Sequence, residues 1–520
     1  MSTVTIRELP ERYNACEILD HNLEAGHGEK VAVHCGSQTV TYAELAARTQ
    51  AFAAALREVG VRREERVLLI LDDTPAWPTA FLGAMRIGAV PVPVAFLDNP
   101  QNFAHHLRDS YAQVVVVEST VADKLATVLD ELPSRPRVWS ANGEGEGADP
   151  LEELLAEHAG AEVTTLDTHR DDMAFWLYSS GSTGKPKGVV HLHHDIPYTC
   201  QTYARHILEI EESDTTLSTT KLYHAYGMGN SLSFPYSVGA STILLPGRAN
   251  PQGTLATAAE LRPTLFFSVP TLYNAMLNLP DAGDYDLSSV RRCASAAEPL
   301  SPTVLRRWRE AFGLEILDGI GSTEMLHIYC SNRPGQIVPG TSGQPVPGYE
   351  LELLDEDGHQ VPEGEVGNLH VRGDSAHAFY WHQHEKTKAA VKGDWFFTGD
   401  RYRRAEEGGY VYEGRADDMI KVGGLWVSPI EVEYALSEHP VVIEAAVVGV
   451  NKDETTRLKA YLVCREREGP REELEAELQQ WCKERLRRYE YPHLFEFVED
   501  LPKTLTGKIQ RYKLRESAQN

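Results

Sequence analysis

The sequence predicts a large α/β body of mostly parallel sheets, followed by a small C-terminal α+β domain. Over roughly the first 400 residues, short apolar runs bounded by polar or turn residues alternate with amphipathic helical patterns. Such runs are typical of strands buried on both faces, as in parallel sheets covered by helices. The composition changes near residue 415, after which a shorter α and β alternation has enough apolar residues for its own core. The predicted domains are therefore residues 1–414 and 415–520.

The first helix with clear end signals begins after Thr41. Thr41 and Glu44 form a capping box, in which each side chain accepts a hydrogen bond from the other residue's backbone N–H. The Gly- and acid-rich segment Ser140–Pro150 predicts a surface loop. The predicted buried strands of the body are Val67–Leu71, Val114–Val117, Ala174–Leu177, Thr242–Leu245 and Leu265–Val269.

The C-terminal region opens with a second capping box, formed by Ser428 and Glu431. Pro429 lies between them at the first helical position, where its missing N–H costs nothing, and the helix should end before Pro440. Two strand-like runs follow, 445–450 and 460–464. The apolar stripe of the next predicted helix is Leu474, Leu478, Trp481, Cys482 and Leu486.

The composition excludes several functional classes. The 520 residues include 50 Lys+Arg and 76 Asp+Glu, for a net charge of −26, which opposes diffuse binding to nucleic acid or to an anionic membrane. The seven scattered cysteines form no CxxC pair, so neither a disulfide framework nor a zinc site is indicated. A polar N-terminus and the lack of any apolar run of about 20 residues predict a cytoplasmic protein.

The segment Tyr178–Gly188, YSSGSTGKPKG, has the chemistry of a polyphosphate-binding loop. Its glycines let the backbone approach an anion, while hydroxyls and two lysines supply donors and charge. Pro186 stands where the GxxxxGK[ST] pattern needs its second glycine, so the loop is not a P-loop. The alternative is a flexible Gly/Ser turn. The nearby histidines of the HLHH run at 191–194 have no evident acid partner and predict a helix start rather than a metal site.

This segment resembles the phosphate loop of the adenylate-forming superfamily, which includes acyl- and aryl-CoA synthetases, nonribosomal peptide adenylation domains and beetle luciferases. Four more family-like segments follow in order: Asp318–Glu324, Thr398–Asp400, Gly414–Lys421 and Pro502–Lys508. The resemblance spans residues 30 to 515. It implies that a carboxylate attacks the α-phosphate of ATP, which releases pyrophosphate and leaves an acyl-adenylate.

By this resemblance, Glu324 would bind Mg²⁺, a hard ion that prefers oxygen ligands. Asp400 would accept hydrogen bonds from the ribose hydroxyls, and Arg415 would donate in the same region. Lys508 would bridge the attacking carboxylate and the phosphate, with Thr183 also in the catalytic set. The implied nucleotide-binding residues are Ser179, Ser180, Gly181, Ser182, Thr183, Gly184, Lys185, Lys187, Ala297, Glu298, Pro299, Asp318, Gly319, Ile320, Thr323, Asp400 and Arg415.

The resemblance also implies a second half-reaction, in which the mobile C-terminal domain rotates to allow thioester formation with CoA. Lys508 lies about 325 residues after Thr183, so domain closure would have to bring it to the phosphates. Asp417 matches the hinge position. Gly423, Gly424, Leu425 and Trp426 match the segment that lines the pantetheine tunnel; a plain β-turn is the alternative for that loop.

Within the superfamily, the segments at 221–230, 318–332 and 424–433 look like the benzoate-CoA ligase branch. The implied lining of the acid pocket is Tyr226, Ala296, Gly321, His327 and Ile328. His327 could bond a para hydroxyl or simply fill space. His224 could contact the acid's carboxylate or only pack as a gate residue. The chain departs from the branch at His224, where an aromatic residue is usual, and in Ser295–Leu300, which reads SAAEPL instead of SAGEAL.

The sequence therefore predicts an ATP-dependent aryl-CoA ligase that uses Mg²⁺, takes a small aromatic carboxylic acid and CoA as substrates, and is a monomer or homodimer. An aryl-adenylating enzyme that loads a carrier protein and a non-aromatic acyl-CoA synthetase are alternatives. A non-catalytic nucleotide-binding protein on the same fold is a third. That last reading leaves the distant Lys508 without a role.

Overall fold

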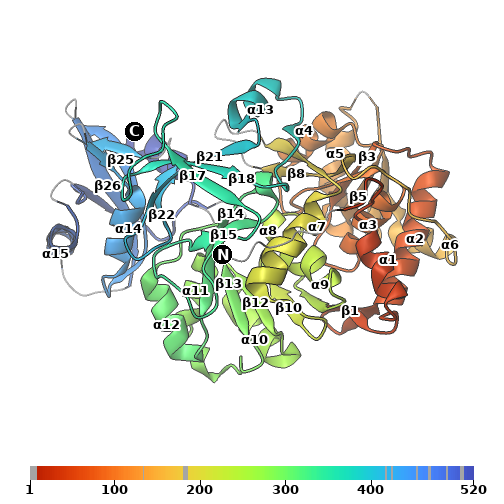
Figure 1. Ribbon diagram of the computed structural model, residues 1–520, viewed down its shortest axis with the longest axis horizontal. Helices are drawn as coiled ribbons and strands as arrows, with labels where there is room; N and C mark the ends of the chain where they lie inside the picture. The colour runs from red at the N-terminus through yellow and green to blue at the C-terminus, as the bar shows by residue number, and fades with distance from the viewer. Residues whose placement is uncertain are drawn as a thin grey trace.

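The computed structural model describes residues 9–132, 134–179, 186–415, 419–422, 425–452, 455–465, 470–487, 490–503 and 509–519. Figure 1 shows an N-terminal α/β region at one end, a central α/β region, and the C-terminal region at the other end. No helix among these residues is long and apolar enough to cross a membrane. The predicted α/β class is confirmed.

The valine-rich runs form a five-stranded parallel sheet, as predicted. Its strands in spatial order are β4 (Val90–Pro93), β3 (Arg66–Ile70), β5 (Val114–Glu118), β6 (Arg137–Ala141) and β7 (Asp149–Pro150). Alternate residues of β3 and β5 belong to two different apolar clusters, one on each face of the sheet. Because both faces are buried, residues 67–70 and 114–117 are apolar throughout and show no alternation with polar residues. The neighbouring helices are α3 (Ala76–Arg86), α4 (Pro100–Ser110), α5 (Ala122–Leu129) and α6 (Leu151–Glu157).

A nine-stranded sheet forms the centre of the molecule. Its spatial order is β16 (Gln344–Pro345), β15 (Ile328–Ser331), β14 (Ile316–Gly321), β13 (Arg292–Ser295), β12 (Leu265–Ser268), β10 (Thr215–Ser218), β11 (Ser241–Leu244), β1 (Val31–Cys35) and β2 (Gln38–Thr41). The strands from β14 to β1 pair in parallel, whereas the pairs at both ends are antiparallel. The carboxyl ends of β10, β13 and β14 therefore lie along one edge, where ligands of open α/β sheets bind.

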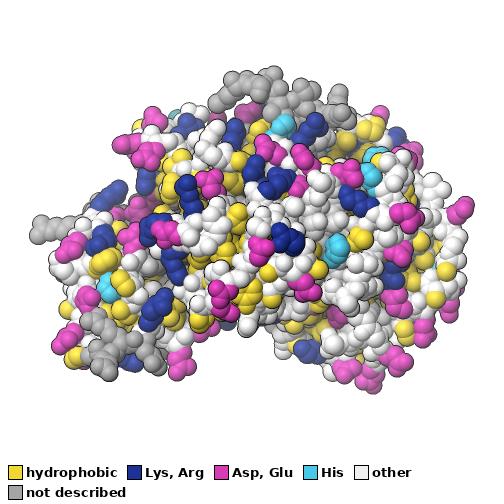
Figure 2. Space-filling view, turned by 90° about the horizontal axis from the view of Figure 1, so that it is seen from below, with side chains coloured by type: hydrophobic (Ala, Val, Ile, Leu, Met, Phe, Trp, Pro, Cys, Tyr) yellow, Lys and Arg dark blue, Asp and Glu magenta, His cyan; other side chains and the backbone are white. Residues whose placement is uncertain are grey.

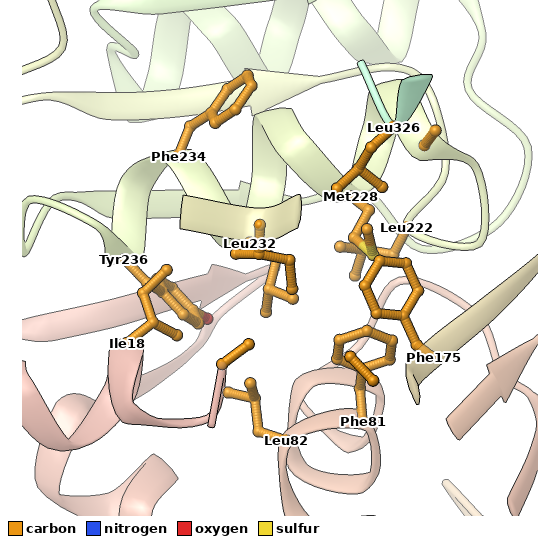
Figure 3. Close-up of a cluster of buried hydrophobic side chains, with 14 of the residues drawn as sticks. Ile18, Phe81, Leu82, Phe175, Leu222, Met228, Leu232, Phe234, Tyr236 and Leu326 are labelled. Atoms are coloured by element: carbon orange, nitrogen blue, oxygen red, sulfur yellow. The ribbon is translucent and has the colours of Figure 1, made fainter. Parts of the chain in front are cut away.

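The helices around this sheet begin where the sequence places end signals. Thr41 caps α2 (Tyr42–Glu58) through the predicted capping box with Glu44. The remaining helices are α1 (Glu17–Glu24), α7 (Asp195–Thr199) with its continuation η2 (Cys200–Leu208), α8 (Ala225–Met228) with η3 (Gly229–Ser233) and α9 (Phe234–Tyr236), α10 (Pro251–Leu261), α11 (Pro270–Leu277) and α12 (Pro302–Phe312). Side chains from the N-terminal helices and from α8 to α9 meet in one buried apolar cluster (Figure 3).

Two antiparallel sheets complete the body. One contains β8 (Met173–Ser179), β9 (Lys187–Leu192) and β19 (Phe379–Tyr380); the other contains β17 (Glu350–Leu354), β18 (Gly367–Arg372), β21 (Trp395–Arg404), β20 (Val391–Lys392) and β22 (Tyr410–Arg415), with α13 (His384–Ala390) between β19 and β20. In β17 and β18 buried residues alternate with more exposed ones, whereas the central residues of β8 and β9 are all buried. On the face drawn in Figure 2, acidic and basic side chains are interspersed.

The C-terminal region has apolar clusters of its own. Its elements are β23 (Ile420–Val422), β24 (Leu425–Val427), α14 (Pro429–Ser437), β25 (Val442–Lys452), β26 (Thr455–Cys464), α15 (Arg471–Arg485), β27 (Leu494–Phe497) and α16 (Arg511–Gln519). Ser428 caps α14 as predicted. Ala445 and Val447 face one cluster, whereas Ala446 and Val448 face the other, as the period of two along a strand requires. The division at residue 414 stays a prediction.

Candidate active site

Glu324 is a buried carboxylate that two neighbouring side chains contact directly. Its side chain lies just beyond the carboxyl end of β14, and the residue is only 8% exposed. Its Oε1 lies 2.9 Å from Lys187 Nζ and accepts a hydrogen bond from the Tyr380 hydroxyl at 3.0 Å. Burial by itself raises the pKa of this carboxyl, but the charge of Lys187, the neighbouring His377 and the hydrogen bond from Lys187 together outweigh it, so the pKa falls to about 2. Glu324 is therefore ionised at neutral pH.

The local sequence explains why Glu324 stands where it does. Ser322 interrupts β14, and its hydroxyl accepts the N–H of Met325 at 3.2 Å, which starts the short turn η5 (Thr323–Met325). Gly321 permits the close crossing of β14 and β15, because a Cβ there would lie 2.5 Å from the carbonyl oxygen of His327. The turn thus leaves the strand at a fixed angle and directs Glu324 toward Lys187.

Lys187 and Tyr380 reach Glu324 from two adjacent strands. Lys187 opens β9, and Tyr380 on β19 pairs with Val189 of β9. The Lys187 ammonium also lies 4.0 Å from the centre of the Tyr380 ring, a favourable cation–π contact. Ser179 ends β8 with its hydroxyl 3.5 Å from Glu324 Oε1. The two ends of the predicted phosphate loop therefore meet at Glu324.

Asp400 and Arg415 lie side by side, as the resemblance implies for one ribose region. They are directly opposite each other on β21 and β22, with Arg415 Nη1 3.1 Å from Asp400 Oδ1. Arg415 Nη1 also donates to the Thr398 carbonyl at 3.1 Å. Gly399 between them has φ +76°, and a Cβ there would lie 2.7 Å from Arg415 Nη2, so only glycine fits without displacing the guanidinium.

The two segments implied for adenine are neighbours at the ends of parallel strands. Ser295 on β13 is in register with Asp318 on β14, so the turn after β13 lies beside Asp318. The Thr271 hydroxyl donates to Glu298 Oε2 at 2.6 Å, which ties this turn to α11. Ala297 has φ +75°, a left-handed conformation that favours glycine. The departure from SAGEAL thus falls on the position of the turn where glycine fits best.

The predicted acid-pocket residues form a buried wall. The rings of Tyr226 and His327 lie 5.4 Å apart, and His327 contacts Phe234 at 4.4 Å. His327 Nε2 lies 3.2 Å from Asn230 Oδ1 and 3.3 Å from the Tyr226 carbonyl oxygen. Burial lowers the pKa of His327 to about 3, so the ring is neutral. Both acceptors face Nε2, which therefore carries the proton, and these contacts favour the packing role over a substrate contact.

The rest of the predicted pocket surrounds this wall. Gly229 lies against the His327 ring, because a Cβ there would be 2.3 Å from His327 Cδ2. Ile328 pairs with Gly321 across β14 and β15, and Ala296 is buried directly after β13. His224 precedes α8, with its ring 4.5 Å from that of Tyr223. The structure thus brings the predicted acid-binding residues to the same sheet edge as Glu324.

Several predicted residues lie outside the described part of the chain. These are Ser180, Gly181, Ser182, Thr183, Gly184, Lys185, Asp417, Gly423, Gly424 and Lys508. Leu425 and Trp426 form β24, which pairs with β23 in an antiparallel hairpin. Their arrangement around a nucleotide or a pantetheine arm stays a prediction.

One interpretation of the histidine run was wrong. His191 does have an acid partner, because its Nδ1 lies 2.7 Å from Asp195 Oδ2 and its Nε2 lies 2.8 Å from the Thr323 carbonyl oxygen. Asp195 starts α7, so the helix start that the run predicted is present. His191 thereby holds the backbone next to Glu324. Within the described ranges, the one group of three side chains close enough to share a metal is Asp355, Asp357 and His359, which are exposed.

Sequence reasoning missed two residues at Glu324. The Tyr380 hydroxyl contacts the carboxylate directly. His377 is buried, its backbone N–H donates to the Glu324 carbonyl at 2.7 Å, and its ring lies 4.4 Å from that of Tyr380. Burial lowers the pKa of His377 to about 4. Neither residue belongs to a phosphate or metal motif, and both lie more than 50 residues from Glu324 in the chain.

The family models agree with this geometry. One that describes AMP-binding enzymes matches residues 19–381, and one that describes the C-terminal domain of AMP-binding enzymes matches residues 431–508. The chain is 45% identical to benzoate–CoA ligase of Thauera aromatica, over 98% of this chain and 97% of that protein. It is 38% identical to the 4-hydroxybenzoate–CoA/benzoate–CoA ligase of Rhodopseudomonas palustris, over 97% and 94% of the two chains.

Solved structures give the same picture. The crystal structure of the anthranilate CoA ligase AuaEII in complex with anthranoyl-AMP superposes with a TM-score of 0.95 at 40% identity, over 98% of both chains. A benzoate CoA ligase from Burkholderia xenovorans LB400 superposes with a TM-score of 0.91 at 43% identity, over 97% of this chain and all of that one. The chain therefore belongs to the adenylate-forming superfamily of AMP-binding enzymes, in the branch that includes the benzoate–CoA ligases.

Proposed function

We propose that the protein is an ATP-dependent aryl-CoA ligase. It would convert a benzoate-type acid to its acyl-adenylate with release of pyrophosphate, and then transfer the acyl group to CoA. The observation that carries the proposal is the ionised, buried Glu324 beside Lys187, at the sheet edge that also holds the Tyr226–His327 wall. The 45% identity to a benzoate–CoA ligase over nearly the whole chain supports it.

Glu324 is the side chain that would hold Mg²⁺. Its carboxylate is deprotonated at neutral pH, and a hard cation with a partly retained water shell needs few protein oxygens. Bound Mg²⁺ would neutralise charge on the phosphates. Lys187 is placed to take part in the same task, because its ammonium already faces the carboxylate at the end of the phosphate loop. Asp400 would accept from the ribose hydroxyls, with Arg415 fixing its position.

The acid would lie with its carboxylate toward the phosphates and its ring against Tyr226 and Ala296. A flat ring fits a pocket of small residues beside an aromatic one. His224 would be the residue near the carboxylate. In the first half-reaction a carboxylate oxygen bonds to the α-phosphorus as the bond to pyrophosphate breaks. Lys508 would stabilise the charge that builds up between these anions.

The second half-reaction would use the C-terminal domain differently. CoA thiolate attacks the acyl carbon and AMP leaves. Gly423, Gly424, Leu425 and Trp426 would line the pantetheine path, and Asp417 would be the hinge. A cytoplasmic location and a monomeric or homodimeric state stay predictions.

The test is pyrophosphate release with ATP and Mg²⁺ over a panel of benzoates, cinnamates and fatty acids, with and without CoA. Turnover that needs CoA on a subset of benzoates is expected. Release that CoA does not stimulate would favour a carrier protein as the acceptor, and turnover on fatty acids alone would favour a non-aromatic acyl-CoA synthetase. No pyrophosphate release with any acid of the panel would contradict the proposal. Lys508→Ala should stop adenylation while leaving thioester formation from supplied aryl-adenylate largely intact.

A further inference from the structure

A buried charged cluster lies directly behind the segment that carries His224 and Tyr226. It contains one ammonium, from Lys221, and three carboxylates, from Asp72, Asp73 and Glu118, and all four residues are less than 9% exposed. They come from three different places: the turn after β3, the end of β5 and the loop after β10. The cluster therefore joins the N-terminal sheet to the central sheet.

Lys221 and Asp72 tie the loop after β10 to the end of β11. Lys221 Nζ lies 2.8 Å from Asp72 Oδ1 and donates to the Leu245 carbonyl at 2.5 Å. Asp72 Oδ2 accepts the N–H of Gly247 at 2.5 Å. On the other side, the Asp72 N–H donates to Glu118 Oε1 at 3.0 Å. Each partner of this network is thus held by at least one hydrogen bond from another element.

Asp73 holds the backbone of the loop itself. Its Oδ1 accepts the N–H of Leu222 at 3.0 Å, and its Oδ2 lies 3.8 Å from Lys221 Nζ. The carbonyl of Lys221 then accepts the N–H of His224 at 3.0 Å. Two hydrogen bonds in sequence therefore run from a side chain that is 2% exposed to the backbone of His224.

The other side of the loop is fixed by close packing. A Cβ on Gly227 would lie 2.1 Å from the Lys221 carbonyl oxygen, so the backbone of α8 is in close contact with that of the loop. Figure 3 shows Leu222 and Met228 pointing into the same apolar cluster as Phe81 and Phe175. The apolar packing holds the segment but sets no direction for its N–H groups, whereas Asp73 does, because a hydrogen bond is directional.

We propose that Asp73 and Lys221 are positioning residues for the acid site: with Asp72 they fix the backbone of the loop after β10 and thereby place His224 and Tyr226 against the substrate carboxylate and ring. The inference rests on the proposed function, because it assumes that these two side chains meet the acid. Among the described residues, the side chains of Asp72, Asp73 and Lys221 form hydrogen bonds and ion pairs with one another and with Leu222, Leu245 and Gly247, Glu118 accepts from the Asp72 N–H, and none of these contacts runs to Glu324. The loss of this cluster should therefore affect acid binding far more than ATP binding.

Asp73→Ala is the informative variant. It leaves the buried Leu222 N–H without its acceptor, which lets the loop shift. Asp73→Asn is the conservative rescue, because its amide oxygen can still accept from Leu222. Both remove one of three carboxylates around a single ammonium, so neither creates an unpaired buried charge. If Asp73→Ala does not fold, Asp73→Ser replaces it, because its shorter side chain cannot reach both Leu222 and Lys221.

Asp214→Ala is the matched control. Asp214 is 3% exposed and pairs with Arg291, with Nε 2.9 Å from Oδ1. It also accepts from the Thr264 hydroxyl at 2.6 Å. It directly precedes β10, whereas Lys221 follows the carboxyl end of the same strand. The control therefore removes a carboxylate of similar burial at the opposite end of one strand.

Pyrophosphate release at varied acid and varied ATP, together with hydrogen exchange of the peptide containing Leu222, tests the proposal. Asp73→Ala should raise the KM for the aromatic acid about tenfold, leave the KM for ATP within twofold, and speed exchange at Leu222 about tenfold; Asp73→Asn should recover most of both. Asp214→Ala should lower the Tm without either change. Equal rises in both KM values, or the same acid KM in Asp73→Ala and wild type, would overturn the positioning role. If the wild type turns over no aromatic acid, the proposed function fails, and unchanged exchange at Leu222 would then separately overturn the anchor.

Discussion

Lys187 and Lys221 are both largely shielded from solvent and both face carboxylates, yet the pKa values of the two carboxyl groups compared here shift in opposite directions. Lys187 faces one carboxylate, Glu324, whose pKa falls to about 2. Lys221 is shared with Asp72 and Asp73, and burial raises the pKa of Asp73 to about 7 even though Lys221 and the Leu222 N–H lower it. The distance to the nearest ammonium differs as well, at 2.9 Å for Glu324 and 3.8 Å for Asp73.

The difference shows that burial alone does not decide the charge of a carboxyl group. A buried carboxylate stays ionised when one cation and good donors serve it alone, and it tends toward the neutral form when several acids share one cation. The two sites suit two tasks. In the proposed function Glu324 would have to stay negative to bind Mg²⁺, whereas Asp73 need only present an oxygen to the Leu222 N–H, which either protonation state can do.

Of the variants considered, Glu324→Gln should have the largest effect, and that effect is on adenylation. It keeps the shape but removes the charge that would hold Mg²⁺, and a bound metal supplies several kcal/mol of stabilisation. Adenylation should fall about a thousandfold, ~4 kcal/mol, measured as ATP–pyrophosphate exchange. Glu350→Gln, at an exposed ion pair with Arg372, is the control and should be unchanged. Near-normal exchange in Glu324→Gln would remove Glu324 from the catalytic set.

Lys187→Met should raise the pKa of Glu324, so that this buried carboxyl resembles that of Asp73. Without its cation the buried carboxyl should have a raised pKa, and the free energy of unfolding at pH 7 should fall by about 3 kcal/mol. The loss should shrink as the pH falls below the raised pKa of the variant's folded carboxyl, because that carboxyl then binds a proton whereas the wild-type Glu324 stays ionised, and the unfolded state is the same in both proteins. Urea denaturation at pH 7 and pH 4.5 measures this. The same loss at both pH values would indicate lost packing rather than lost charge pairing.

Asp73→Asn should remove a contribution to stability that is larger at low pH than at neutral pH, which is the reverse of what a carboxyl with a lowered pKa contributes. Because the folded pKa of Asp73 is about 7 and its ordinary value is 3.8, its contribution is full below pH 3.8 and is lost as the pH rises through 7. Between pH 4 and pH 7 the free energy of unfolding of the wild type should fall by at least about 2 kcal/mol relative to that of Asp73→Asn. Thermal or urea unfolding of both proteins across this range checks it, and parallel curves would show that Asp73 is ionised throughout.

Tyr380→Phe should give the smallest effect. It removes one donor from Glu324 and leaves Lys187 in place. A hydrogen bond to a charged group contributes about 1.5 kcal/mol, so stability at pH 7 should fall by that amount and ATP–pyrophosphate exchange by less than the effect of Glu324→Gln. A loss as large as that of Lys187→Met would show that the hydroxyl, and not the ammonium, keeps Glu324 ionised.

Much of the parallel fold could be predicted, because local signals decide it. The runs at Val67 and Val114 became β3 and β5, and the helices predicted after Thr41 and Ser428 both begin there, the first with the full capping box and the second with the Ser428 hydroxyl accepting the Glu431 N–H. The strand ends shifted by about one residue, since backbone pairing rather than side-chain type ends a strand. The antiparallel sheet from β17 to β22 was not predicted, although Glu350–Leu354 alternates polar and apolar residues, a readable signal.

The sequence motifs named candidate site residues but not which of them pair with one another. Motifs indicated Lys187 and Glu324, yet no sequence rule says that residues 137 positions apart form an ion pair. The Asp73–Lys221 contact was invisible for the same reason, because neither residue lies in a phosphate motif. The His191–Asp195 contact could have been considered, because Asp195 directly follows the histidine run and lies only four residues after His191.

Gly227 has a practical consequence for redesigning the substrate range. Any side chain there would meet the Lys221 carbonyl, so a library that varies residues 222–230 one at a time would lose members at this position before catalysis is tested. Exchanging the whole loop and α8 together with their Asp73 anchor would keep the close contact intact. Redesign of this pocket should therefore exchange the loop, α8 and Asp73 together, because changing single pocket residues is less productive.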